Sequence, residues 1–295
     1  MSSFHPLLSA ALFRIFVAMK FVDVKNDVAF RKIFGNENKK IILISFLNAV
    51  LGLEGQDRVK EVTLLNPFQL PRIIGEKASI IDVRATDKRG VTFIVEMQVA
   101  ERAGFDKRVL YYTCKDYAGQ IKVGDDYPAL RPVYFIGILD FNFFAGKNYL
   151  SKHLIIDEET GECVFKDMQF RFIELHKFNK NADGLDSIID QWTFFIKNAD
   201  ELEVIPENVE DEGLAAAYTE AAQHNWTKEA YDAYIYAGMR AQDERGIVEL
   251  AERRAEEKGE KNSKLQIARE MKIEGEPKEK IIKYTGLTEE EIDEL

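Results

Sequence analysis

Cysteine is nearly absent from this sequence, which excludes the scaffolds and sites that depend on it. The 295 residues include two cysteines, Cys114 and Cys163, too few and too far apart for a disulfide framework or a zinc knuckle. We expect both to be structural thiols of a protein in a reducing cytoplasm. The four histidines also lack the spacing of a metal-binding motif.

Long apolar runs are missing as well. A membrane span needs about 18 uninterrupted apolar residues, and the opening run from Leu7 to Met19 is shorter and contains Arg14. This run has no basic segment before it and no small-residue cleavage pattern, so a secretory signal is not expected. We interpret residues 1–19 as a non-native or flexible N-terminal extension, with Met19 as the true start; a leader helix is the alternative.

An excess of positive charge, the usual footprint of a nucleic-acid-binding protein, is also lacking over the whole chain. The net charge is −11, but it is distributed unevenly. Residues 20–131 hold 19 Lys and Arg against 15 Asp and Glu, whereas residues 132–295 hold 20 against 36. The first part can therefore still face a phosphate backbone, although its surplus of charge is small.

What the sequence does contain is a clear β-hairpin at residues 79–99. Apolar and polar residues alternate on both sides of Asp87-Lys88-Arg89-Gly90, which predicts two strands with one buried face. A three-residue loop with glycine in the left-handed position would place Asp82 opposite Glu96, and Gln98 opposite Ile80.

Helices and strands alternate around this hairpin, which indicates an α/β fold with a helical C-terminal region. Asn26 or Asp27 can cap the first helix, and the continuously apolar segment 131–141 predicts a central strand. We divide the chain into a domain at 20–205, a helical extension at 206–260 and a small tail at 261–295 that is similar to a helix-turn-helix. The acidic residues of that tail favour packing or homo-oligomerisation over DNA reading.

The opposed carboxylates of Asp82 and Glu96 repel each other unless a positive charge lies between them. A divalent cation with hard oxygen ligands, Mg²⁺ or Mn²⁺, would resolve this. The alternative is an ordinary exposed sheet face on which Arg84 pairs with Glu96.

The spacing of Asp82, Glu96 and Gln98 before a helix is similar to the PD-(D/E)XK nuclease motif, with Ile81 in place of the proline and Gln98 in place of the lysine. The wider sequence resembles the Rpn family of recombination-promoting, transposase-like nucleases over roughly residues 20–260. The segments that carry the resemblance are NDVAFRKIFG (26–35), FLNAVLGL (46–53), IDVRATDKRG (81–90), VEMQ (95–98), FDKRVLYYTCKDYAGQIKVGDDY (105–127) and RPVYFIGILDF (131–141).

This resemblance implies a PD-(D/E)XK fold, a mixed central sheet flanked by helices, and metal-dependent hydrolysis of DNA phosphodiester bonds. It makes Asp82, Glu96 and the backbone carbonyl of Met97 metal ligands. Gln98 has no charge to stabilise hydroxide, so it would orient the attacking water and leave its activation to the cation.

Further candidates lie on the two helices that flank the hairpin. Asp27 is a catalytic acid or else a helix cap. Arg108, Tyr112 and Lys115 share one helix face and could hold a phosphate, and Gln120 is a weaker substrate-binding candidate. The alternative is a solvated helix edge.

We therefore expect a cytoplasmic Mg²⁺- or Mn²⁺-dependent DNA endonuclease that promotes recombination. Strand transfer by a transposase would use the same site. The alternative from another class is a catalytically degenerate DNA- or protein-binding module that keeps the fold.

Overall fold

The computed structural model describes residues 20–69 and 79–295, so the predicted extension at 1–19 lies outside the described residues. The helices are α1 (Asp27–Phe34), α2 (Ile41–Leu51), α3 (Phe105–Ala118), α4 (Ile188–Asn198), α5 (Glu212–Ala221), α6 (Lys228–Ile273), α7 (Lys278–Thr285) and α8 (Glu289–Asp293). Short 3-10 turns lie at Gly55–Asp57, Tyr127–Ala129, Leu175–Lys177, Ala182–Gly184, Ala199–Glu201 and Gln223–Asn225.

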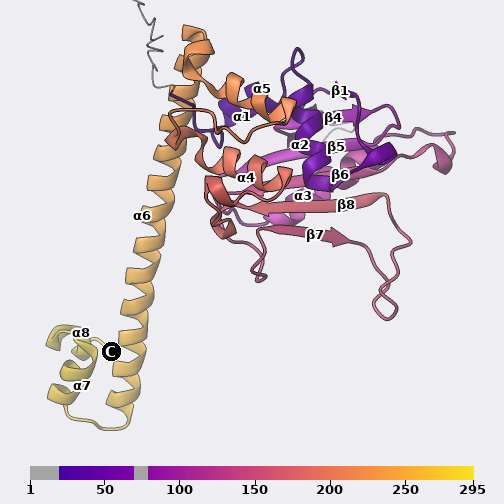
Figure 1. Ribbon diagram of the computed structural model, residues 1–295. Coiled ribbons are helices and arrows are strands. Elements are labelled where there is room, and N and C mark those ends of the chain that lie inside the picture. Colours follow the sequence, from indigo (N-terminus) through magenta and orange to yellow (C-terminus); the bar gives the residue numbers. More distant parts are fainter. Residues whose placement is uncertain (1–19, 70–78) are drawn as a thin grey trace, which may run out of the picture. The chain divides into compact units, whose positions relative to one another are not determined.

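A mixed sheet of six described strands forms the centre of the first part of the chain (Figure 1). The strands are β1 (Val62–Leu64), β4 (Val83–Asp87), β5 (Thr92–Gln98), β6 (Val133–Leu139), β8 (Met168–Glu174) and β7 (Leu150–Leu154), in spatial order. β5, β6 and β8 are parallel, and antiparallel strands flank them on both sides. The predicted mixed central sheet is confirmed, and segment 131–141 supplies β6 with parallel neighbours on both sides.

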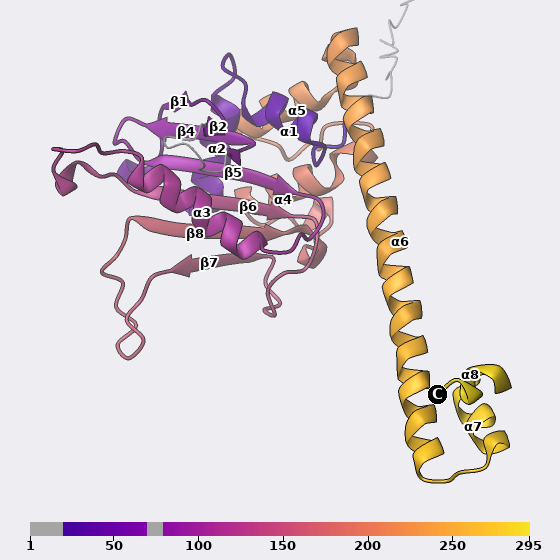
Figure 2. The ribbon, with the colours of Figure 1, turned by 180° about the vertical axis from the view of Figure 1, so that it is seen from behind.

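Helices cover both faces of this sheet. Phe105 and Val109 of α3 pack against Ile94 and Phe135 on one face, and Figure 2 shows α3 in front of the strands. The other face packs against α1, α2, α4 and α5, with the buried Trp192 in this larger core. The prediction that the hairpin has one buried face is therefore wrong for β5, whose residues 92–97 are all buried. The sequence period shows how side chains alternate but not that a later helix covers the second face.

A separate two-stranded sheet joins β2 (Phe68–Gln69) and β3 (Ser79–Ile80). Ile80 pairs with Phe68 in this sheet. The predicted position of Gln98 opposite Ile80 is therefore wrong, because the chain leaves the main sheet before β4 begins.

The structure divides the chain at a different place from the predicted domain boundaries. One compact unit extends to Ala237 and the second covers Gly238–Leu295. α5 lies in the first unit because Leu214, Ala217 and Tyr218 are buried in its core. In the second unit, the end of α6 packs with α7 and α8 around Ala268, Ile281, Leu287 and Ile292.

A capping box begins α8, with the Thr288 hydroxyl accepting from Glu291 N and the Glu291 carboxylate accepting from Thr288 N. None of the described helices combines the length and the apolar character that a transmembrane span requires.

The close contact between α2 and α5 gives a test of the fold. A Cβ added to Gly213 would lie 2.6 Å from the Ile41 carbonyl oxygen and closer still to the Ser45 Cβ. We expect Gly213→Ala to destabilise the protein by about 1–3 kcal/mol. Gly246→Ala on α6 is the control, because its added methyl meets no atom within 4 Å and should be neutral or stabilising by up to about 1 kcal/mol. Chemical denaturation compares the two variants, and equal effects would contradict this packing.

Candidate active site

The turn between β4 and β5 fixes the register of the two carboxylates. Gly90 has φ 82°, and the Asp87 side chain accepts hydrogen bonds from the backbone amides of Arg89 and Val91. Val83 then pairs with Val95. The next positions along the two strands are Asp82 and Glu96, so the predicted register is confirmed.

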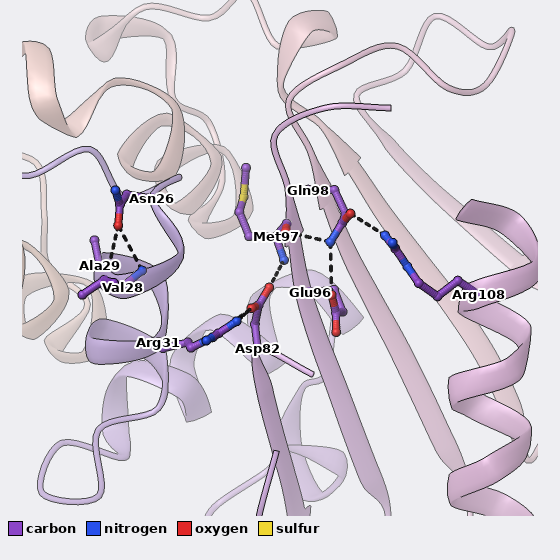
Figure 3. Close-up of polar contacts among 9 residues, drawn as sticks. All are labelled: Asn26, Val28, Ala29, Arg31, Asp82, Glu96, Met97, Gln98 and Arg108. Atoms are coloured by element: carbon purple, nitrogen blue, oxygen red, sulfur yellow. Dashed lines mark hydrogen bonds and ion pairs between the residues drawn. The ribbon is translucent and has the colours of Figure 1, made fainter. Parts of the chain in front are cut away.

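Both carboxylate oxygens of Asp82 accept hydrogen bonds (Figure 3). Arg31 on α1 donates to Oδ1 through Nε at 3.0 Å and through Nη2 at 2.8 Å, and Met97 N donates to Oδ2 at 2.9 Å. The Asp82 side chain is only 9% exposed. Burial raises the pKa of Asp82 above its ordinary value, although the Met97 amide and Arg31 oppose this shift.

The Glu96 carboxylate has fewer hydrogen-bond partners to offset its burial than the Asp82 carboxylate has. The residue is 5% exposed, and its Oε2 accepts one hydrogen bond from Gln98 Nε2 at 3.2 Å. Its Oε1 is buried and has no hydrogen-bond partner among the described residues. Burial, and next to it the negative charge of Asp82, raise the pKa of Glu96 to about 8. Ionising Glu96 beside Asp82 would therefore create more negative charge than the protein partners of the hairpin offset.

Gln98 is held between the carboxylates and α3. Its Nε2 also donates to the Met97 carbonyl at 2.9 Å, and its Oε1 accepts from Arg108 Nη2. The Arg108 guanidinium lies over the Phe105 ring, 5.5 Å from the centroid. Figure 3 shows Gln98 between Glu96 and Arg108. This arrangement fixes the orientation of the Gln98 amide. It also places the Arg108 guanidinium near Glu96, with the Gln98 side chain between them.

Two more candidates lie close enough to influence the pair electrostatically. Tyr112 is half-buried; burial raises its pKa, and the charge of Glu96 adds to the shift. Asp27 contributes to the raised pKa of Asp82. The α1 cap is Asn26, whose side chain accepts from Val28 N and Ala29 N, so Asp27 is not the helix cap.

The structure does not bring every candidate to the carboxylates. Lys115 Nζ lies 5.6 Å from the Tyr111 ring centroid. Gln120 exchanges two hydrogen bonds with the Arg131 backbone, of 2.9 and 2.7 Å, and so connects the end of α3 to the approach to β6. Arg84 pairs with Asp116 of α3. The alternative prediction that Arg84 neutralises Glu96 is therefore wrong.

Arg31 is the residue of the site that the sequence analysis missed. It follows Asp27 by one helical turn and therefore lies on the same face of α1. That spacing was the available signal, but nothing in the sequence shows that this face of α1 lies against the hairpin.

The oxygen atoms available at the hairpin are ligands that suit a hard divalent cation. Two carboxylates and the Met97 carbonyl offer oxygen ligands, and the unpartnered Glu96 Oε1 is the kind of buried acceptor that a cation satisfies. Among the described residues, no group of three or more His, Cys, Asp or Glu side chains gathers to hold a metal. A cation here would depend on the carboxylate pair together with backbone oxygen or water.

A mixed sheet with a carboxylate pair on the hairpin that precedes α3 defines a protein of the PD-(D/E)XK nuclease class. The chain belongs to the family described as PD-(D/E)XK nuclease family transposase, whose profile matches residues 24–251. This confirms the family and fold that the sequence resemblance predicted. Nucleases of this class generally use divalent metals and act on DNA. Comparisons with curated proteins and with solved structures gave no match.

The raised pKa of Glu96 predicts that, in the absence of metal, the stability of the folded protein depends on pH. Its pKa is about 8 in the folded protein against an ordinary value of 4.5. The folded state therefore holds a proton that the unfolded state releases, and stability falls as the pH rises from 4.5 through 8. Glu96→Gln removes this loss, so we expect it to stabilise the protein by roughly 2–4 kcal/mol at pH 9 and by much less at pH 5.

Thermal unfolding in EDTA at the two pH values measures this difference. Glu101→Gln, at an exposed position just after β5, is the matched control and should show no such pH dependence. A benefit of Glu96→Gln that stays constant from pH 5 to pH 9 would contradict the burial argument.

Proposed function

We propose that this protein is a Mg²⁺- or Mn²⁺-dependent DNA endonuclease that hydrolyses phosphodiester bonds and promotes DNA recombination. The observation that carries the proposal is the buried pair of Asp82 and Glu96, with the unpartnered Glu96 Oε1. A nuclease fold accounts for such a pair, because burying two carboxylates with only a partial counter-charge destabilises a protein.

Asp82, Glu96 and the Met97 carbonyl would hold the cation. When bound, a divalent cation makes water a stronger nucleophile and offsets the charge that develops on the scissile phosphate. Met97 N already orients Asp82 through Oδ2, so the ligand geometry of this residue is fixed by the backbone of β5.

Gln98 would direct the attacking water. Its amide can donate and accept hydrogen bonds but cannot act as a base. Arg108 keeps that amide oriented through Oε1 and would also contact phosphate together with Tyr112. Asp27 would adjust the charge of the site, and Lys115 would contact the DNA backbone away from the carboxylates. Gln120 has both ends of its amide bonded to backbone, which favours a structural role over substrate binding.

The helical C-terminal residues and the cellular setting complete the proposal. We infer homo-oligomerisation through the C-terminal helices and a cytoplasmic location, where DNA is accessible and the free Cys114 and Cys163 stay reduced. Strand transfer would use the same residues, because hydrolysis and transfer differ in the nucleophile and not in the cation-binding groups.

A plasmid-cleavage assay tests the central proposal. In Mg²⁺ or Mn²⁺ we expect nicking by the wild-type chain and a loss of roughly 100-fold or more in Asp82→Ala, because a ligand is removed. Asp106→Asn, which changes an exposed carboxylate on α3, is the control and should cleave normally. Equal nicking by the wild type and Asp82→Ala, or none by either with any divalent metal, would exclude the function.

The role of Gln98 has a separate test. Gln98→Met keeps the size of the side chain but removes its hydrogen bonds, so we expect the cleavage rate to fall about 10–100-fold with little change in Mn²⁺ affinity. Gln120→Ala should leave the rate per folded molecule unchanged. The assignment fails if Gln98→Met cleaves normally or if Gln120→Ala loses activity while folded.

A catalytically inactive DNA- or protein-binding module is the second candidate. The neutral Gln98 at the lysine position of the motif favours it, as does the engagement of both Asp82 oxygens by protein donors. Calorimetric titration with Mn²⁺ separates the two functions, since an inactive module should not bind the cation at Asp82.

A further inference from the structure

Arg31 is the cation that contacts the carboxylate pair directly. Its Nε and Nη2 both donate to Asp82 Oδ1, at 3.0 and 2.8 Å. The other two arginines nearby are directed elsewhere, because Arg108 donates to Gln98 and Arg84 pairs with Asp116. Arg31 therefore supplies the counter-charge that Asp82 has within the described residues.

A divalent cation and the Arg31 guanidinium are competing partners of Asp82. Two N–H groups of Arg31 fill the acceptor directions of Oδ1, and Met97 N fills one on Oδ2. A cation bound to an Asp82 oxygen, at about 2.1 Å, would lie a few ångströms from the guanidinium and repel it. Each of the two positive charges therefore weakens the binding of the other to Asp82.

Arg31 is able to leave, whereas Asp82 is not. The Arg31 side chain is 45% exposed and the Asp82 side chain 9% exposed. Arg31 can therefore turn its head group toward solvent or a bound phosphate without breaking core contacts, while Met97 N holds Asp82 in place. A guanidinium released beside the carboxylates has the planar, bidentate geometry that phosphate recognition favours.

We propose that Arg31 competes with the divalent cation for Asp82 and, once displaced, binds the DNA phosphate. Arg31, on α1, thereby supplies the positive charge that the lysine of the motif would carry at the position of Gln98 on β5. This inference rests on the proposed metal-dependent function.

Calorimetric titration of the full chain with Mn²⁺ alone, at pH 9, tests the competition. Arg31→Met should bind Mn²⁺ about 10-fold more tightly than the wild type, since a competitor on a buried carboxylate is removed. Arg31→Lys keeps the charge but loses the bidentate contact, so its affinity should lie between the two. A purely structural role for Arg31 predicts the opposite sign, because a loosened site would bind Mn²⁺ more weakly.

Lys32→Met is the matched control. It removes one positive charge from the next position of α1, but Lys32 Nζ lies over the Trp226 ring at 5.2 Å and does not contact Asp82. Its Mn²⁺ affinity should equal that of the wild type. If Lys32→Met tightens binding as much as Arg31→Met does, a general loss of positive charge explains the effect and the proposal is overturned.

The second half of the proposal is tested by DNA affinity in Ca²⁺, measured by fluorescence anisotropy with a labelled duplex. Arg31→Met should bind the duplex roughly fivefold more weakly than the wild type, whereas Lys32→Met should lose less. Unchanged DNA affinity would remove the phosphate role of Arg31.

The two proposals fail in different ways. If neither the wild type nor Asp82→Ala binds Mn²⁺, the metal-dependent function is wrong and the inference falls with it. If the wild type binds Mn²⁺ and Asp82→Ala does not, but Arg31→Met binds no more tightly than the wild type, then the inference alone is wrong.

Discussion

Two carboxylates buried face to face, with too few protein cations around them, are the constraint on which the rest of this site depends. The hairpin register places Asp82 opposite Glu96, and α3 covers the sheet face that Glu96 occupies. The backbone amide of Met97 and the Arg31 guanidinium compensate Asp82, but one oxygen of Glu96 has no hydrogen-bond partner in the described part of the chain. A large core, with Trp192 and Phe93 fully buried, supplies the stability that tolerates this arrangement. Such a loss of stability is expected where a protein needs charged groups for its function.

The sequence predicted this register but not its surroundings. The Lys88-Arg89-Gly90 loop determines the pairing locally, so alternation and turn chemistry suffice to find the opposed carboxylates. The burial of Glu96 depends on α3, which follows the hairpin in sequence and returns over it. The contact of Arg31 with Asp82 joins residues 51 positions apart. Both depend on tertiary packing, which a local sequence pattern does not contain. Arg108 could be predicted from the face of its own helix, whereas nothing local in the sequence connects Arg31 with the hairpin.

Gln98 and Arg108 are best understood together. The Gln98 amide donates to the Met97 carbonyl and to Glu96 while it accepts from Arg108. A lysine at this position could donate to Glu96, but it could not accept from Arg108, and the two cations would repel each other. The neutral residue at the lysine position of the motif is thus consistent with a site whose positive charge lies on the flanking helices, Arg31 on α1 and Arg108 on α3. The absence of the lysine is therefore compatible with catalysis as well as with an inactive module.

The uneven distribution of charge along the sequence is partly offset in the folded chain, where some of the charges form ion pairs. Some cations of the basic first part pair with acidic residues of the second part. Lys39 lies 2.6 Å from Glu220 of α5, and Lys25 lies 3.8 Å from Asp200. Part of the surplus positive charge of residues 20–131 is therefore used internally. In the proposed function, the cations beside the carboxylates would therefore supply an important part of the attraction for phosphate. A protein of this kind should bind DNA weakly in the absence of a divalent cation and more strongly in its presence, because the cation offsets the acidic pair and releases Arg31.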